Sequence, residues 1–376
     1  MAAAPLDVLI CGAGIAGATL ACLLGRAGHR VVVVERDQGV RSSGAPVDVR
    51  GPAYGVVERL GLLPRLAELA TAVRRVAFVD AAGRTVAELR TRRDPDRELE
   101  IQRGDLSAAL VDAARSSAEL RFDDSVTAAR PDEHGVQVTL SSGGARRFDL
   151  AVGADGLHST FRRLAFGPET EFVTPLAIHI ATVRLGEPMD RTDTVVIHNE
   201  PGAAIALHPV TGTPGAAFLF RSADGVDPRD PAATTALLTR VYGGSGWRGP
   251  ELLAAYRAAP DTYFDTVSRV RLPVWSQGHA TLLGDAASAI SLFGEGSSAA
   301  VLGAAVLADS LRRFPRDVSA ALARYEATHR PITERWQRGA PVAARLLIPA
   351  TRRGIALRNG ALRLASRVRP VERVSR

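Results

Sequence analysis

The chain has 376 residues, which is long enough for two domains that each bury a hydrophobic core. Hydrophobic residues make up 46% of the sequence and charged residues 23%, which excludes an intrinsically disordered or a membrane-spanning chain. The net charge is +7, but its basic side chains are all arginines with acidic residues interspersed, so we expect no nucleic-acid partner.

The sequence contains two cysteines and no segment that is expected to cross a membrane. Cys11 and Cys22 fall within one predicted strand–helix unit, where we expect two small buried side chains rather than a disulfide. No cationic leader precedes the first apolar run, and no uncharged stretch of about 20 apolar residues follows it. We therefore expect a cytoplasmic protein without a transmembrane segment.

A β-α-β unit opens the chain, with strands predicted at residues 6–11 and 30–35 and a helix rich in alanine and leucine between them. Gly12 permits a tight turn, Gly14 lets the backbone approach a pyrophosphate, and Gly17 allows the helix to pack closely on the strand. The unit predicts a site for an adenine dinucleotide. The alternative is a purely structural strand–turn–helix.

Two further features of this unit favour the dinucleotide. The N-terminus of the helix offers unpaired backbone N–H groups, including those of Ile15 and Ala16, to an anion. Glu35 ends the second strand, where its carboxylate can accept hydrogen bonds from an adenosine ribose. We therefore expect the adenosine half of the ligand at this end of the site.

The middle of the chain is richer in predicted strands. A hairpin is predicted between residues 73 and 89, a helix over 104–117 and further strands over 120–152. Apolar segments separated by Gly, Pro and Asp turns over residues 175–220 indicate an antiparallel sheet. The α/β character returns at residues 281–285, and further helices follow to the C-terminus.

A second glycine motif lies about 270 residues beyond the first. Gly284 and Asp285 end a predicted strand, and Gly294 and Gly296 precede Ser297 at the start of a long apolar helix. The N-terminus of that helix can face a polar or anionic cofactor group, and Asp285 can bond the ribityl hydroxyls of a flavin. One long cofactor held at both ends fits this arrangement better than a nicotinamide dinucleotide, so we expect FAD.

Three motifs occur in order along nearly the whole chain. They are Gly12-x-Gly14-x-x-Gly17 with Glu35-Arg36, then Gly153-Ala154-Asp155-Gly156 with Ser159 and Arg162, then Gly284-Asp285. Together they resemble those of the FAD-dependent aromatic hydroxylases, the class A flavoprotein monooxygenases that include para-hydroxybenzoate hydroxylase and tetracycline-modifying monooxygenases.

The resemblance implies an α/β fold. It consists of a Rossmann-like FAD-binding domain with a discontinuous chain, a smaller antiparallel-sheet substrate domain, and C-terminal helices. The expected boundaries are residues 1–72, 98–172 and 272–340 for the FAD-binding domain, 73–97 and 173–271 for the substrate domain, and 341–376 for a basic C-terminal helical segment.

Individual FAD contacts are also implied by the resemblance. Glu35 corresponds to the ligand of the adenosine ribose, and Arg36 to its neighbour on the adenine side. Arg103 resembles the family arginine that contacts FAD from the start of a helix. Asp155 belongs to the motif that the family uses near the pyrophosphate, although it can equally be a turn residue that caps a loop.

The expected surroundings of the flavin ring differ from the family pattern. Residues 43–51 resemble the family loop that passes the ring, where Arg50 offers a cation to the reduced flavin or to an anionic substrate, or is a solvated loop arginine. Ser288 and Ser291 stand where the family usually carries a histidine and a proline, and that proline lies where oxygen reacts. A role without oxygen insertion therefore stays an alternative.

Candidate substrate residues lie on the predicted middle sheet. His179, His198 and His208 are each flanked by β-forming residues, and a histidine can deprotonate a phenol near neutral pH. Phe220, on a neighbouring predicted strand, is a further candidate contact. The alternative for each histidine is a surface residue or a satisfied residue of a strand.

The family mechanism implies an NAD(P)H-dependent monooxygenase that hydroxylates or epoxidises an aromatic or polyketide-like small molecule through a C4a-hydroperoxyflavin. NAD(P)H would act as a transient reductant, and the difficult electron chemistry would belong to FAD. The alternatives are a dehydrogenase, reductase or cyclase on the same fold, and a flavin-binding protein without enzymatic activity.

The C-terminal region is the one distinctly basic part of the chain, with nine arginines and one glutamate over residues 345–376. Leucine, isoleucine and alanine alternate with arginine there at partly helical spacing. We expect the apolar stripe to pack on the FAD-binding domain and the arginines to lie in water. Alternatively, the segment binds an anionic membrane or an acidic carrier protein that delivers the substrate.

We expect the protein to be a monomer or a homodimer.

Overall fold

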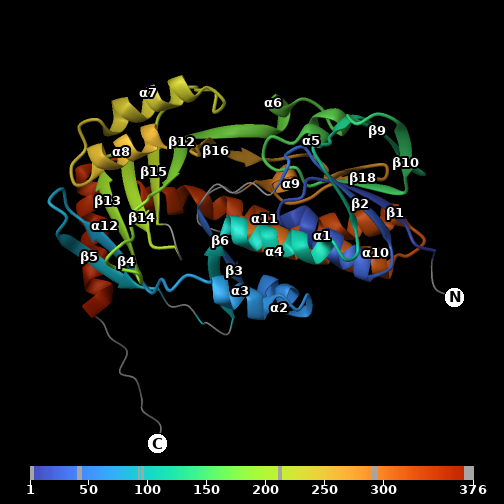
Figure 1. Cartoon of the computed structure of the whole chain (residues 1–376), viewed down its shortest axis with the longest axis horizontal. Helices are drawn as coiled ribbons and strands as arrows, with labels where there is room; N and C mark the ends of the chain where they lie inside the picture. The colour runs from blue at the N-terminus through green and yellow to red at the C-terminus, as the bar shows by residue number, and fades with distance from the viewer. Residues whose placement is uncertain are drawn as a thin grey trace, which may run out of the picture.

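A six-stranded sheet of order β17-β18-β11-β1-β2-β7 forms the centre of one half of the molecule (Figure 1). The structure is a computed structural model that describes residues 4–39, 45–91, 94, 97–210, 214–289 and 295–367. The strands of this sheet are β1 (Asp7–Cys11), β2 (Arg30–Glu35), β7 (Glu119–Phe122), β11 (Leu150–Gly153), β17 (Ser276–Gln277) and β18 (Ala280–Leu282). The sheet is parallel except for β17, which pairs antiparallel with β18.

Both faces of this sheet are covered, which explains why β1 and β2 are almost continuously apolar. On one face, α1 (Ile15–Arg26) packs against both α4 (Arg103–Ala114) and α10 (Glu295–Arg313). An antiparallel sheet of β8 (Val126–Asp132), β9 (Gly135–Leu140) and β10 (Ala145–Phe148) lies on the other side of the strands in Figure 1. Cys11 and Cys22 are free and buried in this core, as expected.

A seven-stranded sheet of order β16-β12-β15-β14-β13-β4-β5 forms the other half. Its strands are β4 (Arg75–Val79), β5 (Thr85–Arg90), β12 (Val173–Arg184), β13 (Thr194–Glu200), β14 (Ala203–His208), β15 (Gly215–Arg221) and β16 (Tyr263–Val270). All neighbouring strands are antiparallel except β4 and β13. The expected hairpin at residues 73–89 thus forms β4 and β5 at one edge of the sheet.

The two faces of the seven-stranded sheet meet different surroundings because alternate side chains point to opposite faces. Phe218 and Phe220 pack with leucines of α7 (Pro231–Tyr242) and α8 (Gly249–Ala258), which cover the outer face. Leu219 and Ile178 lie on the inner face, where they pack with residues at the end of α11 (Val318–Leu347). The inner face is therefore the one turned toward the rest of the molecule.

The remaining elements lie outside the three sheets described so far. They are β3 (Pro46–Arg50), α2 (Pro52–Arg59), α3 (Leu63–Leu69), β6 (Glu98–Gln102), α5 (Thr160–Ala165), α6 (Glu169–Phe172), α9 (Asp285–Ser288) and α12 (Arg352–Arg367). β3 and β6 pair as a separate antiparallel ribbon. The expected α/β fold class is confirmed, whereas the exact domain boundaries stay a prediction.

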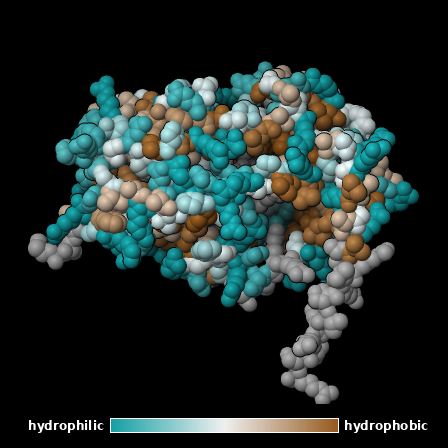
Figure 2. Space-filling view, turned by 180° about the vertical axis from the view of Figure 1, so that it is seen from behind, coloured by the Kyte–Doolittle hydropathy of each residue, from teal (hydrophilic) through white to brown (hydrophobic). Residues whose placement is uncertain are grey.

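The C-terminal helix α12 differs from the expectation for the basic segment. It packs on β5 and β13 of the seven-stranded sheet rather than on the six-stranded half. Arg358 is buried, with its guanidinium 4.0 Å from the centre of the Phe78 ring, whereas Leu357 and Leu364 are 76% and 67% exposed. The expected packing partner was wrong, because Leu362 packs with the core at the inner face of the seven-stranded sheet. Arg358 is an exception to the expectation that the arginines lie in water, since a stacked guanidinium can face the protein interior. Figure 2 shows apolar surface near this end of the molecule, and residues 368–376 lie outside the described part.

None of the helices in the described part of the chain is long and apolar enough to cross a membrane.

Candidate active site

A cavity of about 660 Å³ lies between the two halves of the molecule. It begins at the carboxyl ends of β1, β2 and β11, the edge at which open parallel sheets bind their ligands. From there it continues to the inner face of the seven-stranded sheet at β12, β14, β15 and β16. Its volume is within the range of roughly 300–1,000 Å³ that is typical of ligand pockets.

The glycines of the first motif shape the turn between β1 and α1. Gly12 has φ 102°, and a Cβ there would lie 2.6 Å from the Ala154 carbonyl oxygen. A Cβ on Gly17 would lie 2.0 Å from the Gly12 carbonyl oxygen, so helix and turn approach too closely for any side chain. Gly14, by contrast, has open space beside it and lines the cavity.

The N-terminus of α1 is open to the cavity, with Ile15 and Ala16 among the lining residues. Its N-cap residue, Gly14, offers no side-chain cap, and no acidic residue lies in the first turn. The backbone N–H groups and the positive end of the helix dipole are therefore available to an anion.

Glu35 holds the glycine turn and also lines the cavity. Its carboxylate accepts hydrogen bonds from the backbone N–H groups of Ala13 (2.8 Å) and Asp37 (3.1 Å). A carboxylate has about four acceptor positions, so Glu35 keeps the capacity to accept ribose hydroxyls as well. Arg36 lines the cavity next to it.

Asp155 lines the cavity and caps the loop before α5. Its carboxylate accepts hydrogen bonds from the Ser159 hydroxyl and from the Phe161 backbone N–H, at 2.9 Å for the latter. Burial raises its pKa, and these hydrogen bonds act in the opposite direction. Asp155 therefore caps the loop, which is the alternative that the sequence left open. It does so next to the expected pyrophosphate site.

Arg162 joins this loop to the second glycine motif. The side chain is fully buried and donates hydrogen bonds to the carbonyl oxygens of Ala286 (3.0 Å) and Leu157 (2.7 Å). Its guanidinium lies 3.5 Å from the Glu169 carboxylate. The motif Gly153-Ala154-Asp155-Gly156 with Arg162 therefore fixes the position of α9.

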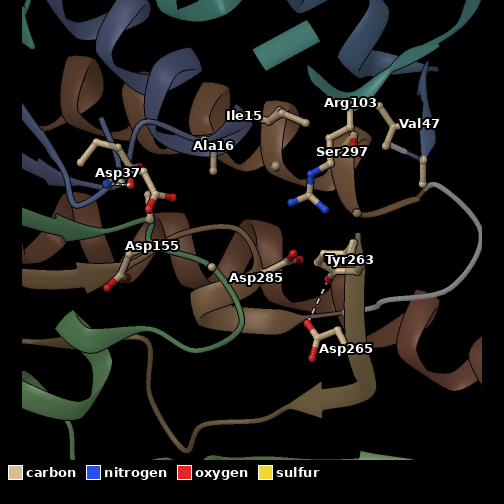
Figure 3. A pocket seen from close by; sticks show the side chains of 18 of the residues that line it. Ile15, Ala16, Asp37, Val47, Arg103, Asp155, Tyr263, Asp265, Asp285 and Ser297 are labelled. Carbon is tan, nitrogen blue, oxygen red and sulfur yellow. Dashed lines mark hydrogen bonds between the residues drawn. The ribbon is translucent and has the colours of Figure 1, made fainter. Parts of the chain in front are cut away.

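Asp285, the first residue of α9, points into the cavity opposite Arg103 (Figure 3). Burial raises the pKa of its carboxyl group, and the charge of Arg103 lowers it. No described residue forms a hydrogen bond with this carboxylate. Gly284, which precedes it, has φ 64°, and a Cβ there would lie 2.9 Å from the Ala16 side chain. The backbone conformation thus holds Asp285 close to α1.

The start of α10 completes this side of the cavity. Gly296 and Ser297 line it, and Ser297 is seen beside Arg103 in Figure 3. Gly294 and Ser291 lie outside the described residues. Ser288 is buried and is not among the residues that line the cavity, so its replacement of the family histidine does not change the lining directly.

Three of the four expected substrate residues lie on the outer face of the sheet, away from the cavity. His179 stacks on Phe220 with ring centres 5.1 Å apart, and Phe220 belongs to the core under α7 and α8. His198 lies 6.0 Å from the ring of Trp247 on the same outer side. None of these residues lines the cavity, because the alternation of each strand turns them away from it.

Arg50 also does not line the cavity. Its guanidinium forms an ion pair with Glu295, and its backbone N–H donates a hydrogen bond of 3.1 Å to the Ser298 hydroxyl. These contacts fasten β3 to the start of α10. The structure thus shows Arg50 as a connection between two elements that border the site, and its expected catalytic role stays a prediction.

His208 is the one expected substrate residue that reaches the cavity. Its Nε2 atom lies 3.3 Å from the Glu100 carboxylate, which also accepts a hydrogen bond from the Thr71 hydroxyl. The neighbouring lining of the sheet is apolar and includes Ile180 and Leu219. This part of the cavity is suited to a ring system with few polar groups.

Two lining residues, Tyr263 and Asp265, were missed by the sequence analysis. The Tyr263 hydroxyl donates a hydrogen bond of 3.0 Å to Asp265 (Figure 3). The opposite Asp265 oxygen lies 3.4 Å from Nε2 of His158, and Nδ1 of His158 lies 2.9 Å from Glu169. The sequence does contain a signal for this pair, because Tyr263 and Asp265 alternate with apolar Phe264 on a strand and therefore share a face.

Known proteins resemble this chain over most of its length. Residues 5–340 match the family described as FAD binding domain. An uncharacterized protein of Mycobacterium tuberculosis strain H37Rv is 39% identical over 88% of this chain and 91% of its own length. A flavin-dependent monooxygenase of an unknown prokaryotic organism is 30% identical over 87% of this chain and 86% of its own length. The crystal structure of tetracycline destructase Tet(51) superposes with a TM-score of 0.83 at 26% identity, covering 96% of both chains.

The chain therefore belongs to the family of flavoproteins with this FAD-binding domain, that of the FAD-dependent aromatic hydroxylases. It is an FAD-dependent monooxygenase, as the sequence predicted, and the alternative of a dehydrogenase, reductase or cyclase is not favoured. NAD(P)H is the reductant typical of the family.

Proposed function

We propose that FAD lies along the cavity, with its adenosine at α1 and Glu35 and its ribityl chain at Asp285. An aromatic or polyketide-like small molecule then occupies the remaining space under the inner face of the seven-stranded sheet, and the enzyme inserts an oxygen atom into it. The observation that carries this proposal is the continuity of a single cavity from the start of α1 to that sheet.

The residues at the first part of the cavity fit FAD. The uncapped N-terminus of α1 is suited to a pyrophosphate. The Asp285 carboxylate, without a hydrogen bond from the described residues, is suited to hydroxyl donors. A buried carboxylate without a partner is unfavourable, so ribityl hydroxyls would supply the missing hydrogen bonds.

The residues at the second part fit an apolar ring system. Ile180, Leu219, Val267 and Leu347 give an apolar wall, and His208 with Glu100 adds one polar point. A tetracycline destructase, an enzyme named for its action on tetracycline, superposes on this fold. A substrate of similar ring character would cover the apolar wall and exclude water from the cavity.

When FAD is bound, it supplies electron transfer from NAD(P)H and the activation of oxygen. The protein's own residues bind the cofactor and the substrate and orient them. The α1 N–H groups neutralise the pyrophosphate, and Arg103 places a positive charge near Asp285. Side chains of the seven-stranded sheet hold the substrate and keep water away. Delivery of the substrate by a carrier protein, a cytoplasmic location, and assembly as a monomer or homodimer stay predictions.

The placement of the substrate is tested by filling its part of the cavity. Leu219→Trp adds a large side chain to the inner face, at a position remote from α1. We expect FAD affinity to be unchanged, while substrate-stimulated NAD(P)H oxidation falls for every aromatic or polyketide-like compound that the wild-type enzyme accepts. Unchanged kinetics for all these compounds would show that the substrate lies elsewhere.

A further inference from the structure

We propose that Tyr263, Asp265 and His158 form a proton relay that carries a proton from solvent to the reacting groups in the cavity. The proposal rests on the monooxygenase reaction proposed above. It assigns to these three residues a role that neither FAD binding nor the apolar substrate wall explains.

The relay is a continuous path of polar atoms across the boundary between the two halves of the molecule. Tyr263 lines the cavity and donates its hydroxyl hydrogen to Asp265 at 3.0 Å. Asp265 is 16% exposed, and its second oxygen lies 3.4 Å from Nε2 of His158. His158 is 41% exposed, so its ring reaches the solvent. The path therefore has one end in the cavity and the other in water.

The inner end of the path lies at the FAD-binding side of the cavity. The side chain of Tyr263 is close to that of Asp285 in Figure 3, and its hydroxyl turns toward Asp265. Its pKa is strongly raised, first by burial and then by the charge of Asp265, with Asp285 adding to the increase and Arg103 opposing it. Tyr263 thus remains a protonated phenol, which can accept a proton from one side while it gives a proton to the other.

His158, at the outer end of the path, holds a proton at neutral pH. Hydrogen bonds with Asp265 and Glu169 raise the pKa of His158 to about 9, against the effect of burial. Glu169 in turn lies 3.5 Å from the guanidinium of Arg162. These groups, from β16, α6 and α5, are the charged groups that face the imidazole in the described part of the structure. His158 is therefore a cation at neutral pH, and after it gives its proton away it can take another from water.

The overall reaction requires a supply of protons from solution. A monooxygenase converts substrate, O₂, NAD(P)H and one proton into hydroxylated substrate, NAD(P)⁺ and water, so each turnover consumes a proton from solution. At rest the Tyr263 hydroxyl donates to Asp265. In the relay, His158 Nε2 gives its proton to Asp265, and the Tyr263 hydroxyl turns to the acceptor in the cavity and gives it a proton. The Tyr263 oxygen then takes the proton that Asp265 holds. His158 then takes a proton from water, and every group has regained its charge.

Three variants and two matched controls test the relay in the FAD-loaded full-length enzyme. Tyr263→Phe removes only the hydroxyl, His158→Asn removes the proton donor, and Asp265→Asn removes the central carboxylate. Tyr54→Phe, on α2, and His134→Asn, in an exposed turn, make the same chemical changes away from the cavity. The controls should behave as wild type.

We expect Tyr263→Phe and His158→Asn to lower kcat by about a hundredfold, the lower end of what acid–base groups contribute, with the dissociation constant for FAD unchanged. In the wild type, kcat should fall as the pH rises through about 9, when His158 loses its proton. That fall should be absent in His158→Asn. Wild-type kcat and an unchanged pH profile in both variants would overturn the relay.

A second readout does not require turnover. We expect the His158 imidazole of the FAD-free protein to titrate near pH 9 by NMR, and its pKa to fall in Asp265→Asn. An unperturbed His158 in the wild type would also overturn the relay. If the NMR result is as expected but the wild-type enzyme oxygenates no substrate, the proposed function fails and the polar path is structural.

Discussion

Replacing Asp285 by asparagine removes a negative charge from the cavity while the side chain keeps its size. We expect the dissociation constant for FAD to rise by roughly tenfold to a hundredfold, because hydrogen bonds to a charged group contribute about 1.5–3 kcal/mol. Isothermal titration with FAD measures the change. The exposed Asp112→Asn on α4 should leave the constant unchanged.

The same variant should not destabilise the FAD-free protein. Burial raises the pKa of the Asp285 carboxyl, so its charge is unfavourable there before FAD binds. The melting temperature of FAD-free Asp285→Asn should therefore equal or exceed that of the wild type. A lower melting temperature together with unchanged FAD affinity would assign Asp285 to stability instead of cofactor binding.

Gly17 is required for close contact between α1 and the turn before it. The added methyl group of Gly17→Ala would lie 2.0 Å from the Gly12 carbonyl oxygen, which only a shift of the backbone can relieve. We expect the free energy of unfolding to fall by about 1–3 kcal/mol, the usual cost of overpacking. Gly339→Ala in α11, with open space around it, should instead be stabilising by up to about 1 kcal/mol. Denaturant unfolding compares the two.

Arg162 couples two short elements, α5 and α9, that border the cavity. Arg162→Leu would leave the carbonyl oxygens of Ala286 and Leu157 without their donor, and among the described residues Glu169 would keep only His158 as a partner. We expect a loss of about 3 kcal/mol in the free energy of unfolding, because each buried acceptor that is left without a hydrogen bond costs about 1–3 kcal/mol. The exposed neighbour Arg163 provides the control, since Arg163→Leu should change stability by less than about 0.5 kcal/mol. Equal effects would show that α9 is held by other contacts.

His158 joins the loop after β11 to α6 and β16, and this connection depends on pH. The pKa of His158 is raised from 6.5 to about 9 in the folded protein, so its contribution to stability is fully present below pH 6.5 and is lost as the pH rises through 9. The difference in melting temperature between wild type and His158→Asn should therefore shrink between pH 6.5 and pH 10. A constant difference would mean that the neutral imidazole contributes as much as the cation.

The faces of the strands explain why His208 alone of the four expected substrate residues reaches the cavity. Apolar residues occupy both faces of the seven-stranded sheet, because α7 and α8 cover one face and α11 reaches the other. Alternation alone therefore could not show which face meets the cavity. In β12 the pairing register also shifts between Pro175 and His179, which a sequence pattern does not reveal.

At the scale of the whole molecule, the parts that could be predicted from the sequence are those in which ligand binding requires particular residue types. The turn with Gly12 and Gly17 and the position of Asp285 follow from backbone constraints that are visible in the sequence. The relay residues His158 and Asp265 meet only when the two halves pack together, and they lie 107 positions apart. The inward orientation of Arg358 likewise depends on the position of the Phe78 ring in another element.

The origin of the inserted oxygen tests the central claim most directly. FAD-loaded enzyme would be supplied with NAD(P)H, ¹⁸O₂ and an aromatic or polyketide-like compound that accelerates NAD(P)H oxidation, and the product analysed by mass spectrometry. A monooxygenase is expected to give a product with one ¹⁸O atom, and unlabelled product when the label is in water instead. A product that forms without O₂, or that takes its oxygen from water, would contradict the account.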